Sequence, residues 1–162
     1  MIDIGANLTH PAFQPDLDAV VARARQAGVA QVVVTGTTVG ESRRAIEIAG
    51  QYSLHATVGV HPHHARECGP ETIPSLRDLA KSARVVAIGE CGLDFNRNYS
   101  PHPDQEKWFV AQLELGTELG KPLFFHSRDA HPRFAEILKA HGVKKAVAHC
   151  FTGERAELRA YL

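Results

Sequence analysis

Short hydrophobic runs recur six times along the chain, and each ends abruptly at a polar residue or a glycine. The runs lie near residues 2–5, 31–35, 56–60, 85–90, 122–126 and 145–149. Consecutive apolar positions rich in β-branched and aromatic residues are typical of parallel strands covered on both faces. An amphipathic segment follows each run, near 16–27, 40–51, 71–82, 103–120, 130–141 and 153–162. The alternation predicts a parallel α/β fold.

The ends of the runs are regularly spaced. They lie 23 to 36 residues apart, at Asn7, Gly36, His61, Glu90, His126 and His149. This spacing fits six consecutive βα units. In a barrel the carboxyl ends of all strands meet at one mouth, whereas in an open doubly wound sheet only those beside the switch point meet. Because metal-ligand residue types recur at successive ends, we favour an incomplete TIM-type (β/α)8 barrel with six units over an open six-stranded sheet.

Composition narrows the class of protein. The 162 residues contain no low-complexity linker or charged block, so we expect one domain over residues 1–162. The formal net charge is zero, which excludes the overall basic footprint of a duplex-DNA binder and leaves only local contacts with nucleic acid. There is no basic leader or long apolar stretch, and the three cysteines lack a disulfide or zinc-finger spacing. We therefore expect a cytoplasmic protein without a membrane span.

Three of the run ends carry metal-ligand residue types. Glu90, His126 and His149 each follow an uninterrupted apolar segment. Alternatively, the glutamate reaches water and each histidine is a hydrogen-bonded core residue. Burying an ionised carboxylate is costly unless it is paired or bound to metal, and three such residues at consecutive strand ends would each have to be a coincidence. We therefore predict a divalent-cation site whose ligands suit Zn²⁺, Mn²⁺ or Co²⁺ better than Mg²⁺.

A histidine-rich turn follows the third run. It has the sequence Gly-Val-His-Pro-His-His and contains His61, His63 and His64. His61 is best placed to face the metal, and we take it as the candidate catalytic residue, in proton transfer or in contact with the leaving group. A solvated turn is the alternative for His61, and it is the reading we favour for His63 and His64.

Two arginines are candidates for binding phosphate or substrate. Arg97 lies in a segment expected to be irregular, residues 91–103, and Arg128 closely follows the fifth run. A guanidinium can stabilise a phosphodiester through two parallel hydrogen bonds. The nearby Phe95 and Tyr99 either stack a base at the rim or pack within the loop. The alternative for each arginine is an ion pair with a neighbouring aspartate: Asp94, Asp104 or Asp129.

The same segments resemble a known enzyme family. They are residues 3–8, 59–63, 87–95, 121–130 and 148–153. In this order they resemble the TatD family of metal-dependent deoxyribonucleases, in the amidohydrolase superfamily, across the whole chain. The resemblance implies a TIM-type barrel and 3′-to-5′ exonuclease action on single-stranded DNA or RNA, favoured by Mg²⁺. It also implies metal ligation by Glu90, His126 and His149.

The chain departs from the family pattern in two places. Many relatives carry a His-x-His pair on strand 1 that binds a second metal, where this chain has Gly5-Ala6-Asn7. Members of the TatD branch have the same kind of sequence at these positions. The missing pair of histidines weakens the case for a two-metal mechanism. Relatives also continue through two more strands and a late aspartate that contributes to the metal site. We therefore expect the chain to be a C-terminally truncated form, about three quarters of the barrel.

Three hypotheses about function result. The first is phosphodiester hydrolysis at the ends of single-stranded nucleic acid by the full-length protein. The second is hydrolysis of a small ester or amide by the same metal chemistry. The third is an inactive metal-binding fragment, in which unpaired strand edges leave the oligomeric state open.

Overall fold

The computed structural model describes residues 1–161, and every predicted strand and helix is present. The strands are β1 (Ile2–Ala6), β2 (Gln31–Val34), β3 (His55–Val58), β4 (Val85–Asp94), β5 (Leu123–Arg128) and β6 (Ala146–Ala148). The α-helices are α1 (Leu17–Gln26), α2 (Val39–Tyr52), α3 (Thr72–Leu79), α4 (His102–Glu118), α5 (His131–Ala140) and α6 (Arg155–Tyr161). Two 3-10 helices, η1 (Pro11–Phe13) and η2 (Pro62–Glu67), complete the described chain.

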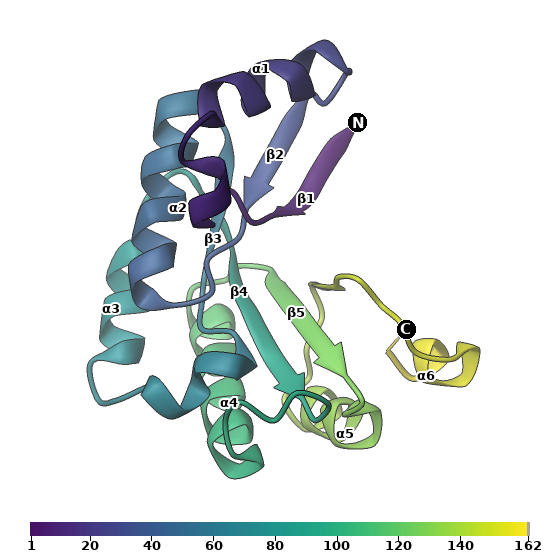
Figure 1. Cartoon of the computed structure of the whole chain (residues 1–162). Helices are drawn as coiled ribbons and strands as arrows, with labels where there is room; N and C mark the ends of the chain where they lie inside the picture. Colours follow the sequence, from purple (N-terminus) through teal and green to yellow (C-terminus); the bar gives the residue numbers. More distant parts are fainter. Residues whose placement is uncertain (162) are drawn as a thin grey trace.

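The six strands form one parallel sheet in sequence order, and each strand pairs with the next. The sheet is curved, and helices α1 to α4 follow one side of it (Figure 1). A doubly wound sheet would carry helices on both faces and reverse its strand order at a switch point. Sequential order with helices outside is the arrangement of a TIM-type barrel, so the predicted incomplete barrel is confirmed.

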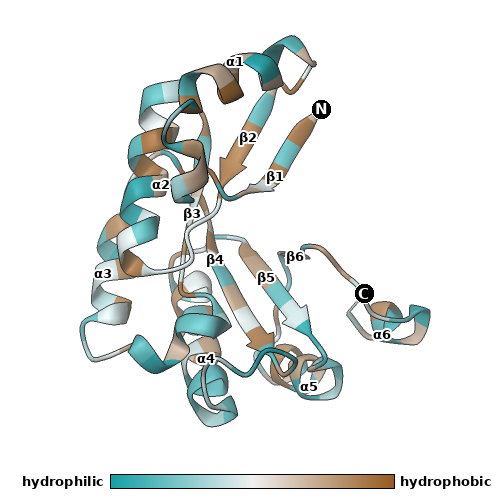
Figure 2. Cartoon of the chain, in the orientation of Figure 1, coloured by the Kyte–Doolittle hydropathy of each residue, from teal (hydrophilic) through white to brown (hydrophobic). Residues whose placement is uncertain are grey.

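The hydrophobic core lies between the outer face of the sheet and the helices. Under α3, α4 and α5 it is centred on Phe109, Phe125 and Phe134, whose ring centroids lie 5.1 to 5.6 Å apart. A second cluster under α1 and α2 includes Val34 and Ile48. Figure 2 shows hydrophobic residues along the strands and mixed with polar ones along the helices. Because successive strand residues point to opposite faces, this packing leaves alternate positions directed into the barrel.

Strand β4 is longer than the sequence predicted. We expected the strand to end at Glu90 and an irregular loop to follow, but β4 continues to Asp94. Gly92, Leu93 and Asp94 all pair with β5, and Leu93 is fully buried. The strand therefore continues past its first charged residue because β5 and the helix layer still offer partners. Glu90 and Asp94 are four residues apart, so both point to the inner face.

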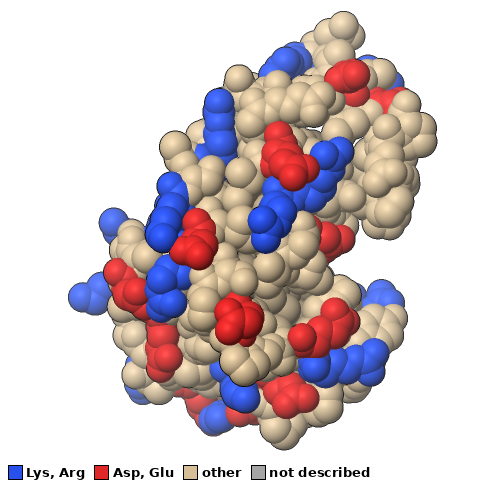
Figure 3. Space-filling view, turned by 90° about the vertical axis from the view of Figure 1, so that its left-hand side faces the viewer, with Lys and Arg blue, Asp and Glu red and all other residues tan. Residues whose placement is uncertain are grey.

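The outer surface carries mixed charge. On the face drawn in Figure 3, Lys and Arg side chains alternate with Asp and Glu. Surface ion pairs include Arg77 with Glu118 and Arg133 with Glu106, each at 2.7 Å. Within residues 1–161 no helix combines the length and the apolar character needed to cross a membrane.

Candidate metal centre

Three strand ends bring Glu90, His126 and His149 together. Glu90 lies in β4, His126 lies in β5, and His149 directly follows β6. The Glu90 Oε1 atom is 2.9 Å from His149 Nε2 and 3.2 Å from His126 Nδ1. One potential ligand atom from each residue lies within 4.8 Å of the other two. The three predicted metal ligands, which are far apart in sequence, thus meet at the mouth of the barrel.

The two imidazoles keep the buried Glu90 carboxyl ionised. Burial alone would raise its pKa, but hydrogen bonds with His126 and His149 outweigh burial and hold the pKa below its usual range. The hydrogen bond with Glu90 in turn raises the pKa of His149 above its usual value. A proton and a metal ion compete for the same lone pair of an imidazole, so a cation bound here would displace a proton.

His61 reaches this cluster from the end of β3. Its Nε2 atom is 3.8 Å from Glu90 Oε1, and its ring centroid is 4.4 Å from that of His126. Its Nδ1 atom accepts a hydrogen bond from the backbone N–H of His63 at 3.2 Å, so the proton of the neutral ring sits on Nε2. Burial lowers the pKa of His61 to about 3, which keeps the ring neutral. His61 therefore presents a single N–H donor to the site.

His63 also faces the site, and the expectation of a solvated residue was wrong for it. Its Nε2 atom is 2.7 Å from Asp94 Oδ2, and its ring centroid is 4.2 Å from that of His61. The reason is local: η2 turns the chain directly after His61, and the buried Asp94 provides an acceptor. The next residue, His64, has a side chain that is 40% exposed and pairs with Glu67.

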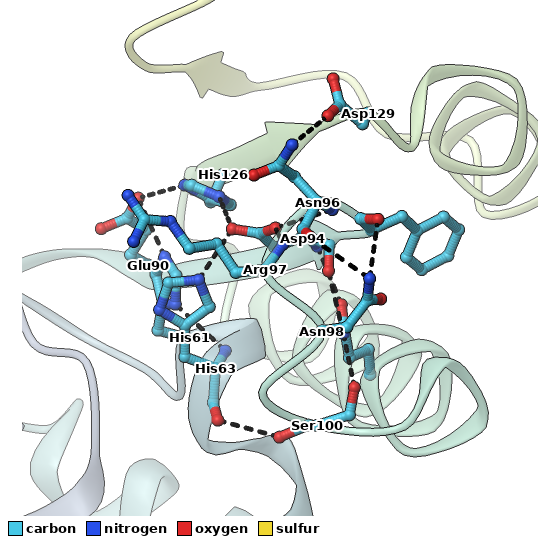
Figure 4. Close-up of polar contacts among 12 residues, drawn as sticks. His61, His63, Glu90, Asp94, Asn96, Arg97, Asn98, Ser100, His126 and Asp129 are labelled. Carbon is cyan, nitrogen blue, oxygen red and sulfur yellow. Dashed lines mark hydrogen bonds and ion pairs between the residues drawn. The ribbon is translucent and has the colours of Figure 1, made fainter.

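Asp94 is the site residue that the sequence analysis missed. Its side chain is only 1% exposed, and Oδ2 lies 2.7 Å from His63 Nε2 and 3.2 Å from His126 Nε2 (Figure 4). Its Oδ1 accepts the backbone N–H groups of Asn96 at 3.0 Å and Arg97 at 2.8 Å. Burial acts to raise the pKa of Asp94, but these hydrogen bonds prevail and lower it to about 2. A strand extended to Asp94 would have shown that Asp94, four residues after Glu90, points to the same face as Glu90. That spacing was the signal in the sequence that could have identified Asp94.

Two buried glutamines of α4 hold the backbone of the site. Gln105 accepts from Asp94 N at 2.8 Å and donates to Asp94 O at 3.1 Å. Gln112 pairs with Val60 in the same way, at 2.7 Å and 3.1 Å. Both glutamines are 1% exposed. The register between β3 and β4 ends at Ile88, so each side-chain amide takes the place of a strand partner beyond that point.

Both candidate arginines are exposed near the ends of the strands that carry the cluster. Arg97 is exposed, and in Figure 4 its side chain points from the loop toward Glu90. Arg128 is exposed at the last position of β5. Within residues 1–161 neither arginine forms an ion pair with Asp94, Asp104 or Asp129: Asp94 contacts two histidines, and Asp129 Oδ2 accepts from Asn96 at 2.7 Å.

The aromatic residues of the same loop differ in exposure. Phe95 stacks on His102 with ring centroids 3.7 Å apart, so it packs within the loop. Tyr99 is 51% exposed and meets His63 edge-on at 4.8 Å. Tyr99 is therefore the aromatic of this loop that presents more of its surface beside the cluster.

Strand β1 contributes space to the centre. A Cβ atom at Gly5 would lie 3.1 Å from His149 Nδ1, closer than most Cβ contacts. A histidine at this position would crowd the His149 ring. The segment Gly5-Ala6-Asn7 thus leaves β1 without a histidine beside Glu90, His126 and His149. Within residues 1–161, a second group that could hold a cation consists of His61, His63 and His126.

The donor set fits a divalent metal ion. One carboxylate and two imidazoles are common ligands of such ions, and metal–ligand bonds of about 2.0–2.2 Å suit donor atoms grouped this closely. His126 directs Nδ1 and His149 directs Nε2 at the same carboxylate oxygen. The cluster can therefore bind a metal without rearrangement of the strands.

Comparison with known proteins identifies relatives along the full length of the chain. The family described as TatD related DNase matches residues 2–162. A 3′-5′ ssDNA/RNA exonuclease TatD from Erwinia amylovora is 53% identical over 100% of this chain and 64% of the relative. The protein of the same name from Pantoea sp. is 54% identical with the same coverage. The chain thus spans 64% of the length of these curated relatives.

Solved structures show the same fold. A TatD homologue from Escherichia coli K12 superposes with a TM-score of 0.92 at 30% identity, covering 99% of this chain and 64% of that one. A TatD family hydrolase from Entamoeba histolytica has a TM-score of 0.91 at 31% identity, covering 98% of this chain and 60% of that one. These likenesses agree with the barrel arrangement of the six strands.

Proposed function

The chain belongs to the family of TatD-related DNases, and from this premise we propose that it hydrolyses phosphodiester bonds at the 3′ ends of single-stranded DNA or RNA. The observation that carries the proposal is the meeting of Glu90, His126 and His149 at one point of the barrel mouth. The proposed activity is that of the whole protein, because its relatives are longer than this chain.

We assign metal binding to Glu90, His126 and His149. A divalent ion held there supplies Lewis-acid stabilisation of a phosphoryl oxygen and lowers the pKa of a bound water. Mg²⁺ is the ion that we propose for activity, and the imidazole ligands also suit Zn²⁺ or Mn²⁺. The Glu90 carboxylate provides a negatively charged ligand, since its hydrogen bonds keep its pKa below the usual range.

We propose His61 as a hydrogen-bond donor to the substrate. Its Nδ1 atom is occupied by the N–H of His63, so Nε2–H is the group free to point toward Glu90 and a bound phosphate. Of the two roles considered for His61, contact with a phosphate or leaving-group oxygen is favoured over proton transfer. The reason is that burial lowers its pKa to about 3 and keeps it from carrying a second proton.

We assign phosphate binding to Arg97 and Arg128. Both are exposed at the strand ends, and the Arg97 side chain points toward the cluster (Figure 4). A local pair of guanidinium groups suits a short strand end and is compatible with the zero net charge of the chain. We further propose that residues 1–162 act as one domain and that the protein works in the cytoplasm.

The test is an end-labelled oligonucleotide assay. The protein is incubated with Mg²⁺ and with single-stranded DNA, single-stranded RNA or duplex, each labelled at one end. We expect stepwise shortening of single strands from the 3′ end. Glu90→Gln should reduce the rate by at least about 100-fold, because even residues that only support a metal ligand account for about 10–100-fold. His131→Gln, at the first position of α5 and outside the cluster, is the matched control.

Two results would contradict the proposal. Hydrolysis of small esters or amides with no action on oligonucleotides would favour a different hydrolase of the same superfamily. Metal binding without turnover of any substrate would favour the inactive metal-binding fragment.

A further inference from the structure

Asp94 lies directly behind one of the proposed metal ligands. In Figure 4 its carboxylate stands next to the His126 ring, on the side away from Glu90. His126 directs Nδ1 to Glu90 Oε1 and Nε2 to Asp94 Oδ2, each at 3.2 Å. The two carboxylates therefore bracket one imidazole through its two different nitrogens.

The Asp94 carboxylate is held rigidly on every side. Its Oδ1 accepts the backbone N–H groups of Asn96 and Arg97, while Gln105 binds both the N–H and the C=O of Asp94 itself. Its Oδ2 is shared by His63 and His126. The Asp94 side chain is 1% exposed, and most of its hydrogen bonds are made with groups other than His126.

We infer that Asp94 is a positioning residue for the metal centre: it accepts a hydrogen bond from His126 Nε2 and thereby presents Nδ1 as the ligating atom. This inference rests on the proposal that Glu90, His126 and His149 hold a metal. A neutral imidazole has one N–H and one lone pair. When a metal is bound, the N–H on Nε2 stays directed at Asp94, and the lone pair on Nδ1 is available to the ion in place of the hydrogen bond to Glu90. Carboxylates behind metal-bound histidines fix the ring and raise its basicity in this way.

The same carboxylate also places His63. The His63 Nε2–H group is directed to Asp94 Oδ2 at 2.7 Å, and the ring lies against His61 and Tyr99. Replacement of Asp94 should therefore disturb both His63 and His126. Metal affinity reports the effect on His126, because His126 is a proposed metal ligand and His63 is not.

Two substitutions at position 94 separate hydrogen bonding from charge. In Asp94→Asn, the amide oxygen can still accept from Asn96 and Arg97, but an NH₂ group then faces the two histidine donors. Asp94→Glu keeps the negative charge and moves the carboxylate out of position. Asp129→Asn is the matched control, because it removes one negative charge from a residue that contacts Asn96 of the same loop.

The first measurement is Zn²⁺ affinity, determined by competition with a chromophoric chelator. We expect Asp94→Asn and Asp94→Glu each to weaken Zn²⁺ binding by about 10–100-fold, the range for supporting residues of metal sites. Asp129→Asn should leave the affinity unchanged. Equal affinities for the wild type and both Asp94 variants would overturn the inference while leaving the metal site intact. If the wild-type protein binds no Zn²⁺, the metal site itself is wrong and the inference falls with it.

The second measurement does not depend on a variant that folds. In the Zn²⁺ complex of the ¹⁵N-histidine-labelled wild type, long-range ¹H–¹⁵N correlation spectra identify which ring nitrogen of His126 carries the proton. The inference requires the proton on Nε2 and the metal on Nδ1. A proton on Nδ1 would show that Asp94 does not set the orientation of the ring.

Discussion

Replacement of Gln112 by methionine should strongly destabilise the protein, although the two side chains are similar in size. Methionine has nearly the length and volume of glutamine but forms no comparable hydrogen bonds, so the change removes the contacts with Val60 N and Val60 O without opening a cavity. Val60 is 5% exposed, and water cannot readily replace the lost partners.

The magnitude follows from the two groups left without partners. A buried backbone donor or acceptor that loses its hydrogen bond costs about 1–3 kcal/mol. Two such groups give a loss of about 2–6 kcal/mol in the free energy of unfolding, a large part of the stability of an ordinary domain. The third bond of Gln112, to Trp108 O, lies within α4 and adds little to this loss because a helix already uses that carbonyl.

The assay is urea unfolding followed by circular dichroism, with Gln51→Met as the control. Gln51 is exposed on α2, where its amide donates to the Tyr52 hydroxyl, so the control should stay within about 0.5 kcal/mol of the wild type. A loss below about 1 kcal/mol for Gln112→Met, with an unchanged slope of the transition, would refute the idea that this glutamine substitutes for a strand partner.

Two further predictions concern the metal centre. Affinity for Zn²⁺ should fall as the pH drops from about 8 to about 5, because Glu90 raises the pKa of His149 and protons then compete for its lone pair; calorimetric titrations that give the same dissociation constant across this range would contradict it. Gly92→Ala should destabilise the protein by at least about 1–3 kcal/mol and weaken Zn²⁺ binding, because Gly92 has φ +146° and a Cβ there would overlap the carbonyl oxygen of His126. Gly50→Ala, in α2 with no atom near the added Cβ, is its control in thermal unfolding.

The sequence predicted those features of the site that depend on a single segment of the chain. Hydrophobic runs ended at Glu90, His126 and His149, and a parallel fold places such ends together, so the meeting of these three residues could be predicted from strand positions. Asp94 could not, because its role depends on β5 continuing to pair with β4 beyond the hydrophobic run. The pairing of two strands depends on both segments, so the sequence of β4 alone does not predict where the pairing ends.

The glutamines of α4 were missed for a related reason. In sequence, Gln105 and Gln112 are ordinary polar residues of an amphipathic helix, and nothing in the pattern marks them as hydrogen-bond partners of the strands. Both glutamines can be buried because strand ends present unpaired N–H and C=O groups opposite their side chains. This placement exists only in the folded protein. His63 was misjudged in the same way, since its acceptor lies 31 residues further along the chain.

The two glutamines also connect both sides of the candidate site to one helix. They stand seven residues apart on α4, about 10 Å along a helix and two turns on the same face. Gln112 binds Val60, the residue before His61, and Gln105 binds Asp94, so both sides of the site are hydrogen-bonded to the same helix. A shift of α4 would carry both sides together and preserve their separation. We therefore expect the separation between Asp94 and His61 to change little when the surrounding loops move.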